Sequence, residues 1–326
     1  MPDRAEDKRP LLDVKGLKKY FPVRGAFGNT VQEVKAVNDV SFSLNRGETF
    51  GLVGESGCGK STLGRTILRL TEPTDGEALY EGADIFAMSP TELQKMRRDM
   101  QMVFQDPYSS LNPRKRIGAI LEEPLSIHNI GTPQERTEKV LETLTRVGLQ
   151  AEHYYRYPHE FSGGQRQRIG IARALMVDPK LIICDEPVSA LDVSIQSQII
   201  NQLKALQNDL GLTFLFIAHD ISVVRYISDR VGVMYLGQMV EQAATDDIFT
   251  DPKHPYTQAL LSSVPLPSVE AKRERIVLKG ELPSPLDPPS GCVFHTRCPV
   301  AMDVCKLQAP ETKEVPTGHR VACHLY

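Results

Sequence analysis

The residues with the clearest chemistry form a glycine-rich loop at 54–61, which reads Gly-Glu-Ser-Gly-Cys-Gly-Lys-Ser. The loop fits the pattern G-x-x-x-x-G-K-[ST], in which glycines let backbone N–H groups turn toward a polyanion. Lys60 would reach the β- and γ-phosphates of a nucleotide, and Ser61 would place its hydroxyl on Mg²⁺. Cys58 is interpreted as a small filler, because no histidine or other base neighbours it in the sequence. The loop predicts a site for ATP and Mg²⁺.

A second candidate group, Asp185-Glu186-Pro187, ends the apolar run 181–184. Carboxylates at the carboxyl end of a parallel strand lie at the crevice where open α/β sheets bind ligands. We expect Asp185 to hold Mg²⁺ through water and Glu186 to polarise the attacking water as a general base. A surface turn could also use Asp-Glu-Pro, but the apolar run before it and the phosphate loop in the same chain disfavour that alternative.

A third group, Ser162-Gly-Gly-Gln165, opens a segment whose apolar residues recur at helical spacing; we name it the signature segment. Together with the phosphate loop and the acidic strand end, it makes the chain resemble the ATP-binding cassette (ABC) family. The resemblance implies an ATPase that works as a pair. Ser162 and the N–H groups of Gly163 and Gly164 would complete the nucleotide site of the facing subunit, at the N-terminus of a helix.

The same resemblance implies roles for other positions. Gln105 matches the loop glutamine that touches metal or water and senses the membrane partner. Asp192 matches the residue that communicates with the opposite site, and His219 matches the switch histidine that contacts the γ-phosphate. Phe21 aligns best with the aromatic residue that stacks on adenine. Tyr20 is the alternative, and a role in the core is open to either ring.

These expectations define three sets of site residues. The expected catalytic residues are Lys60, Gln105, Glu186 and His219. The expected ATP-binding residues are Tyr20, Phe21, Gly54, Glu55, Ser56, Gly57, Cys58, Gly59, Lys60, Ser61, Thr62, Gln105, Ser162, Gly163, Gly164, Gln165, Asp192 and His219. The expected Mg²⁺ ligands are Ser61, Gln105 and Asp185.

The elements that must position these residues alternate between strands and helices, which predicts an α/β fold. The expected strands are 49–53, 181–184, 213–218 and 231–235. Apolar residues at helical spacing predict helices that contain Leu63, Ile67 and Leu70; Val140, Leu144 and Val147; and Ile199, Leu203, Leu206 and Leu210. The ABC resemblance implies a P-loop nucleotide-binding domain at 11–245, with a RecA-like core and a helical subdomain at about 104–175.

Four of the six cysteines lie near the C-terminus, at Cys292, Cys298, Cys305 and Cys323, after a Pro-rich connector. Chains inside the cell seldom keep structural disulfides, so four clustered thiols indicate a metal or iron–sulfur site. Their spacing fits neither the bacterial ferredoxin run nor the paired cysteines of zinc ribbons. On chemistry alone, zinc, an iron–sulfur cluster and unrelated free thiols all stay open.

Segments 254–257, 280–285 and 291–299 resemble the C-terminal extension of dipeptide and oligopeptide importer ATPases, as does 109–114 near Gln105. The match is closest to the second of the two ATPase subunits of such importers. It implies a small cysteine-containing extension at 246–326 whose four cysteines hold a structural 4Fe–4S cluster, with zinc as the alternative. It also implies partners: a second, related ATPase, two membrane-spanning permease subunits and an extracytoplasmic solute-binding protein.

Composition limits the function classes. The 326 residues carry 38 basic and 41 acidic side chains, so the formal net charge of −3 gives no basic footprint for nucleic acid. No stretch approaches the roughly 18 apolar residues of a membrane helix, and the polar start lacks the core of a signal peptide. We therefore expect a cytoplasmic chain, and the importer resemblance implies a peripheral protein on the cytoplasmic face of the bacterial inner membrane. The alternatives are a soluble ABC ATPase acting on nucleic acid or ribosomes, a degenerate ATP-binding regulator, and an importer ATPase for nickel or sugar.

Overall fold

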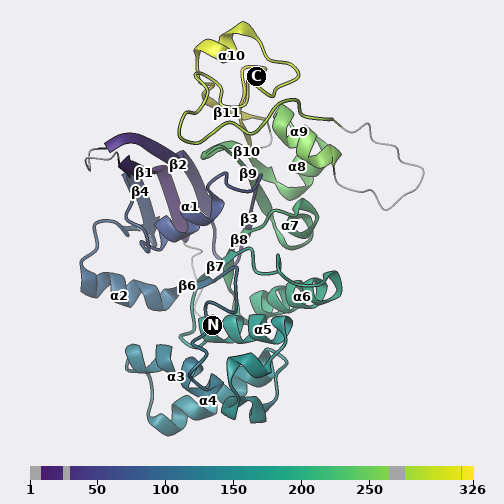
Figure 1. The fold of residues 1–326 in the computed structure, drawn as a ribbon. Helices are drawn as coiled ribbons and strands as arrows, with labels where there is room; N and C mark the ends of the chain where they lie inside the picture. The colour runs from purple at the N-terminus through teal and green to yellow at the C-terminus, as the bar shows by residue number, and fades with distance from the viewer. Residues whose placement is uncertain (1–8, 25–29, 264–275, 317) are drawn as a thin grey trace, which may run out of the picture. The chain divides into compact units, whose positions relative to one another are not determined.

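The computed structural model describes residues 9–24, 30–263, 276–316 and 318–326 (Figure 1). The chain divides into two compact units, the first formed by 1–87 and 220–326 and the second by 88–219. Each unit combines strands with helices, so the predicted α/β class is confirmed. None of the helices in the described residues is both long and apolar enough to span a membrane. The predicted domain limits at 11–245 and 246–326 stay predictions.

The first unit contains two groups of strands. An antiparallel sheet has the order β2-β1-β4-β5, with β1 (Leu12–Arg24), β2 (Thr30–Leu44), β4 (Asp75–Tyr80) and β5 (Ala83–Asp84). The other group has the order β11-β12-β10-β9-β3, with β3 (Thr49–Val53), β9 (Arg230–Tyr235), β10 (Gln238–Ala244), β11 (Thr312–Val315) and β12 (His319–Ala322). β3 runs parallel to β9, and the other neighbours in this group are antiparallel. The extension thus adds its strands to the strand group that leads into the phosphate loop.

The helices of the first unit are α1 (Lys60–Ile67), α7 (Ile221–Ile227), α8 (Thr245–Thr250), α9 (Pro255–Ser262) and α10 (Asp303–Leu307). α1 contacts β1 and β2 (Figure 1). The prediction that Leu70 continues the buried stripe of α1 is wrong. Arg69 takes a left-handed φ of 49°, which ends the helix, and Leu70 is 49% exposed.

The second unit is built on a parallel sheet of order β8-β7-β6, with β6 (Met100–Val103), β7 (Leu181–Asp185) and β8 (Thr213–Ile217). Every residue of β7 and β8 is buried, as their unbroken apolar runs predict. Its helices are α2 (Pro90–Asp99), α3 (Ile117–Ile127), α4 (Pro133–Arg146), α5 (Gly163–Leu175) and α6 (Val193–Leu210), with two short 3₁₀ helices at Ala151–Tyr155 and Pro158–Glu160.

Local sequence explains where two of these helices begin. In α4, Thr132 and Glu135 form a capping box, Pro133 occupies the first turn, and Val140 and Leu144 are buried. α2 begins in the same way, with Ser89 and Glu92 as the capping box. The apolar residues predicted at helical spacing in α6 are buried, except for the last one. This residue, Leu210, is 41% exposed at the end of the helix.

Candidate nucleotide-binding and catalytic site

In the first unit, the buried strand β3 leads into the glycine-rich loop, and the loop ends at α1. Two glycines of the loop have no room for a side chain. A Cβ on Gly54 would lie 2.2 Å from the carbonyl oxygen of Met234, and a Cβ on Gly59 would lie 1.9 Å from that of Ala36. Both also have positive φ values, 153° and 104°. The loop conformation therefore requires glycine at these two positions.

Lys60 lies within the loop and is only 4% exposed. Its Nζ donates hydrogen bonds to the carbonyl oxygens of Gly54 (2.8 Å) and Glu55 (3.1 Å). The N-cap of α1 is Gly59, which offers no side-chain oxygen to the first N–H groups of the helix. A cationic side chain and a helix N-terminus at one loop make a favourable site for phosphate. Cys58 is buried, and burial raises the pKa of its thiol, which suits a filler better than a nucleophile.

The two aromatic residues that could stack on adenine lie on β1 and differ in their contacts and exposure. The Tyr20 hydroxyl donates a hydrogen bond to Asn38 Oδ1 at 2.5 Å, and burial raises its pKa. Phe21 is 39% exposed, with Lys19 Nζ 4.8 Å from its ring centroid. An exposed ring can stack on a base more readily than a ring tied by its hydroxyl. This geometry favours Phe21.

In the second unit, the carboxylate of Glu186 brings three predicted residues together. Glu186 Oε2 accepts a hydrogen bond from Gln105 Nε2 at 2.9 Å and lies 3.3 Å from His219 Nδ1. Glu186 follows the fully buried Asp185 at the end of β7, and its side chain is 14% exposed. A carboxylate in this position can accept a proton, while the amide and the imidazole fix its orientation. Its backbone N–H donates to the carbonyl oxygen of Ile217 at 2.9 Å, which ties it to the end of β8.

The signature segment forms the first turn of α5. Ser162 is the N-cap: its Oγ accepts from the N–H of Gln165, and Gln165 Oε1 accepts from the N–H of Ser162. A Cβ on Gly164 would lie 2.6 Å from Cγ2 of Ile195 in α6, so this glycine allows close packing of the two helices. Asp192 is the N-cap of α6, with an exposed side chain.

The predicted site residues are therefore divided between the units. The first unit holds the loop with Ser61, the expected Mg²⁺ ligand, both aromatic candidates and the four C-terminal cysteines. The second unit holds Gln105, the signature segment, Asp185, Glu186, Asp192 and His219.

The four C-terminal cysteines line one narrow pocket of about 10 Å³, which His295 and His324 also border. All four are free thiols. Burial, aided by the neighbouring cysteines, raises the pKa of Cys292 to about 11. Within the described residues, no group of three or more His, Cys, Asp or Glu side chains is arranged so that it could hold a metal ion. The structure does not support the iron–sulfur or zinc site, which stays a prediction.

Sequence reasoning missed two residues that contact the phosphate loop. Arg297 Nη1 donates to both carboxylate oxygens of Glu55, at 2.8 and 3.1 Å, and the N–H of Glu55 donates to Tyr256 Oη at 2.9 Å. Both residues lie in segments that resemble the importer extension. No spacing rule connects these segments to the loop, which precedes them by more than 200 positions.

A phosphate loop after a parallel strand, with a carboxylate oriented by Gln105 and His219, defines a P-loop ATPase of the cassette class. Comparison with known proteins agrees. Residues 37–189 match the ABC transporter family, and residues 240–305 match the oligopeptide/dipeptide transporter C-terminal region.

Two curated relatives cover nearly the whole chain. The oligopeptide transport ATP-binding protein AppF of Bacillus subtilis is 61% identical over 99% of this chain and 99% of its own length. The dipeptide transport ATP-binding protein DppF of Haemophilus influenzae is 52% identical, also over 99% of each chain. A solved dimeric ATP-binding cassette, in a post-hydrolysis state bound to ADP and phosphate, has a TM-score of 0.64 and 31% identity. The matched region covers 72% of this chain and 98% of the solved chain. This chain belongs to the ABC transporter family, as its motifs predicted, and is an ATPase of that family.

Proposed function

We propose that this chain is the ATP-hydrolysing subunit of a bacterial importer of dipeptides and oligopeptides. The proposal rests on one observation: this single chain matches both the ABC transporter family and the oligopeptide/dipeptide transporter C-terminal region. Relatives that match it over 99% of its length are named as peptide transport ATP-binding proteins. Hydrolysis in the cassette would supply the free energy for import through membrane subunits.

Nucleotide binding is assigned to the phosphate loop. Lys60 neutralises the β- and γ-phosphates, and the N-terminal N–H groups of α1 add partial positive charge. Ser61, Gln105 and Asp185 offer hydroxyl, amide and carboxylate oxygens, the donor types that Mg²⁺ prefers. Bound Mg²⁺ would neutralise charge that develops on the phosphates. The exposed ring of Phe21 stacks on adenine, with Tyr20 as the alternative.

Hydrolysis is assigned to the carboxylate of Glu186. Glu186 accepts a proton from the water that attacks the γ-phosphorus, and the P–O bond to ADP breaks. Gln105, 2.9 Å from Glu186 Oε2, orients the carboxylate and the water. His219, whose ring nitrogen lies 3.3 Å from the same oxygen, is assigned as the switch histidine that would contact the γ-phosphate.

The complete site is shared between two ATPase subunits. The N-terminal turn of α5, formed by Ser162–Gln165, carries no acidic residue and suits a phosphate of the facing subunit. Asp192, the N-cap of α6, signals to the opposite site. The second ATPase subunit is a related but different chain, so the pair is a heterodimer.

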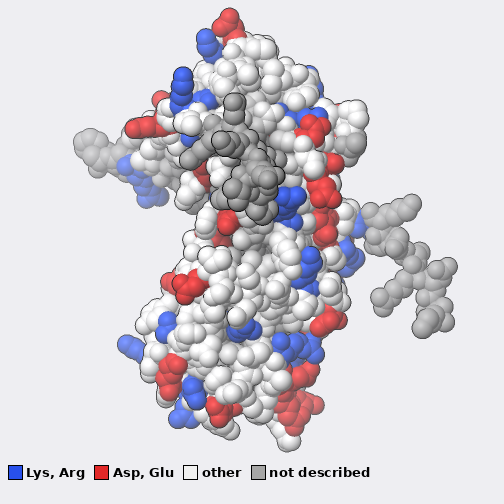
Figure 2. Space-filling model, turned by 90° about the vertical axis from the view of Figure 1, so that its right-hand side faces the viewer, with Lys and Arg blue, Asp and Glu red and all other residues white. Residues whose placement is uncertain are grey.

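The remaining assignments concern domains, partners and place in the cell. The cassette spans 11–245, with a helical subdomain at about 104–175, and the extension spans 246–326. Two permease subunits receive motion from the Gln105 region, and an extracytoplasmic binding protein delivers the solute. The ATPase pair lies on the cytoplasmic face of the inner membrane, held there by the permeases. The alternative of a nucleic-acid ATPase has less support, because acidic and basic side chains are intermingled over the described face in Figure 2.

We assign a 4Fe–4S cluster to Cys292, Cys298, Cys305 and Cys323, with zinc as the alternative. The assignment comes from the resemblance to the importer extension. These four residues border one pocket, but in the described structure they are not arranged to hold a metal ion. The cluster has a structural role, because a small extension with few apolar residues commonly needs a metal to hold its fold.

Growth on peptides tests the proposed function. A bacterial strain that lacks this gene and requires an external amino acid should not grow when dipeptides or oligopeptides are the only source of that amino acid. The wild-type gene should restore growth, whereas Glu186→Gln should not. Normal peptide-dependent growth of the deletion strain, together with loss of nickel or sugar uptake, would assign the chain to another solute.

A further inference from the structure

Glu55, the second residue of the phosphate loop, is held at three points by its neighbours. Its carboxylate accepts from Arg297 at 2.8 and 3.1 Å, and its N–H donates to Tyr256 Oη at 2.9 Å. Its carbonyl oxygen accepts from Lys60 Nζ at 3.1 Å. Two of these contacts come from the region that follows the cassette strands, and the third reaches the lysine that binds phosphate.

Tyr256 is rigidly positioned in the first turn of α9. It is fully buried, and its N–H donates to Nδ1 of the N-cap residue His254 at 3.1 Å. Burial lowers the pKa of His254 to about 4, so the ring is neutral at physiological pH and keeps a lone pair for this bond. The backbone of Tyr256 is therefore fixed at the helix start, and burial confines its ring.

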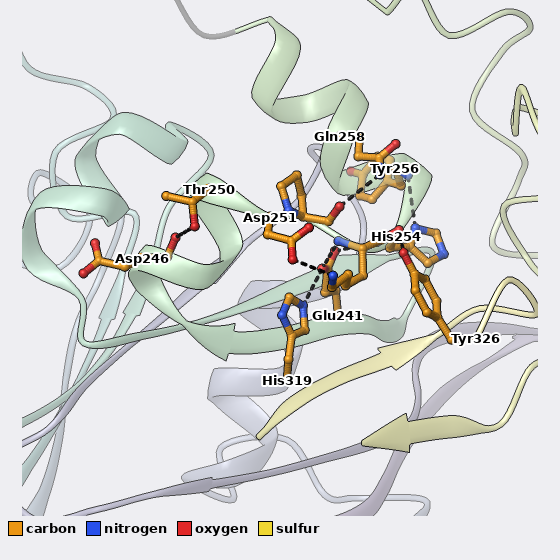
Figure 3. A network of polar contacts seen from close by, with 11 residues as sticks. Glu241, Asp246, Thr250, Asp251, His254, Tyr256, Gln258, His319 and Tyr326 are labelled. Atoms are coloured by element: carbon orange, nitrogen blue, oxygen red, sulfur yellow. Dashed lines mark hydrogen bonds and ion pairs between the residues drawn. The ribbon is translucent and has the colours of Figure 1, made fainter. Parts of the chain in front are cut away.

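The turn before α9 is itself anchored to β10 and to β12, the last strand of the extension (Figure 3). The buried carboxylate of Glu241 in β10 accepts from the N–H groups of Lys253 (2.6 Å) and His254 (3.0 Å). It also lies 2.6 Å from Nε2 of His319 in β12. Polar groups this deeply buried are costly to separate, because each would lose a hydrogen bond without gaining one to water. β10, β12 and the α9 turn thus form one connected support for Tyr256.

Arg297 approaches Glu55 from the cysteine-containing segment. Its side chain is 10% exposed, and that of Glu55 is 27% exposed. Burial opposes the charge of Arg297, but the Glu55 carboxylate outweighs it and the pKa of Arg297 is raised. The backbone around Arg297 is held by Phe294, whose ring packs in one cluster with Tyr235 and Tyr256 at centroid distances of 5.2 and 5.4 Å. Arg297 and Tyr256 are therefore parts of the same packed support.

We propose that Arg297 and Tyr256 are positioning residues for nucleotide binding: they fix Glu55, and through Glu55 the phosphate loop and Lys60. The proposal rests on the loop being the ATP site, as set out under the proposed function. Neither side chain needs to touch the nucleotide. Each contacts Glu55, whose carbonyl oxygen accepts a hydrogen bond from Lys60 Nζ. The C-terminal region therefore contributes to the affinity of the phosphate loop for phosphate.

Calorimetric titration of MgADP into the full-length chain tests this proposal. Arg297→Ala and Glu55→Gln should each weaken MgADP binding about tenfold, the usual effect of losing one coupled contact near a site. The double variant should be no weaker than either single variant, because both remove the same interaction. Arg297→Lys should recover part of the affinity, since it keeps the charge but loses the planar guanidinium.

The matched control is Arg320→Ala, which removes an arginine of the same region whose partner is the exposed carboxylate of Glu314 at 3.3 Å. It should bind MgADP like the wild type. Thermal unfolding without nucleotide shows whether each variant is folded, and Glu55→Gln and Arg297→Lys still test the proposal if Arg297→Ala is not. Wild-type affinity in Arg297→Ala and Glu55→Gln, or fully additive effects in the double variant, would overturn it. If the wild-type chain itself bound no MgADP, the proposed function would fail instead.

Discussion

At the scale of single residues, Glu186 combines an unusual backbone with an oriented side chain. Its φ is +46°, a left-handed value that costs a non-glycine residue about 1–3 kcal/mol. The surrounding structure maintains this conformation through the bond from its N–H to Ile217 and through bonds from Ser189 to its carbonyl oxygen. Strain of this kind concentrates at sites where geometry matters for function. The conformation presents the carboxylate to Gln105 and His219.

Replacing Glu186 by Gln should preserve MgATP binding and reduce the hydrolysis rate by about 10²–10⁴, the usual contribution of a general base. The amide has the same shape but cannot accept a proton from water. Steady-state phosphate release and equilibrium MgATP binding would measure the two effects. Glu142→Gln, at an exposed position of α4, is the control. Near-normal turnover in Glu186→Gln would reject the assignment.

At the scale of elements, two of the three glycines in α5, Gly164 and Gly170, have opposite surroundings. A Cβ on Gly164 would lie 2.6 Å from Ile195 Cγ2, a branched methyl that cannot swing aside easily, whereas a Cβ on Gly170 would meet nothing within 4 Å. Gly164→Ala should therefore destabilise the protein by about 1–3 kcal/mol through overpacking against α6. Gly170→Ala should stabilise it by up to about 1 kcal/mol, because alanine favours a helix. Denaturant unfolding of the two variants compares them directly, and destabilisation by both would contradict the packing argument.

Elements with strong local patterns could be predicted, and those defined by distant contacts could not. β3, β7, β8 and β9 agree with prediction to within one residue, because each is an unbroken apolar run that is buried on both faces. α2 was missed because only one of its residues, Met96, is buried, although its capping box is visible in the sequence. Periodicity extended α1 too far because it carries no information on the left-handed φ of Arg69.

The same contrast holds for the site. The motifs indicated Gln105, Glu186 and His219 one by one, and the structure adds that they meet at one carboxylate oxygen. Nothing in the sequence connects Arg297 with Glu55, because 242 positions separate them and each belongs to a different motif. Contacts of this kind depend on strand order, which local patterns do not encode.

At the scale of the whole molecule, the shared-site proposal predicts that activity depends on association. The isolated chain should hydrolyse ATP weakly, and its specific activity should rise with protein concentration, because Ser162–Gln165 serves the nucleotide of a neighbour. Addition of the second ATPase and the permease subunits should raise the rate further. Full activity in a strictly monomeric preparation, with no concentration dependence, would contradict the proposal.

A mixing experiment on the pairs that this chain forms with itself, in the absence of the second ATPase, makes the shared-site test sharper. Lys60→Ala removes the lysine assigned to phosphate binding, and Gly163→Asp places a negative charge at the start of α5. Each variant should be inactive alone, whereas a mixture should recover part of the activity, because a mixed pair contains one intact loop facing one intact signature segment. No recovery, in a mixture whose pairing is verified by sedimentation, would count against sharing.

The last prediction concerns the four cysteines of the extension. Chain purified without oxygen should be brown, with broad absorbance near about 400 nm and about four irons per chain, as for a thiolate-bound 4Fe–4S cluster. Free Cys292 is protonated at neutral pH, because burial raises its pKa to about 11. Cluster binding must therefore release protons and should weaken as pH falls. A cluster that ties four thiolates together should also make the loaded chain resist proteolysis in this region better than the metal-free chain.

Single serine variants at Cys292, Cys298, Cys305 and Cys323 should each lose iron, whereas Cys184→Ala, in the fully buried strand β7, should keep it. Elemental analysis decides between the possible metals. Stoichiometric zinc without iron would replace the cluster by a zinc site formed by the same thiolates. Absence of both metals after anaerobic purification would reject the site and leave four unrelated thiols. In that case Glu241, His319 and the packing around Phe294 would hold the extension without a metal.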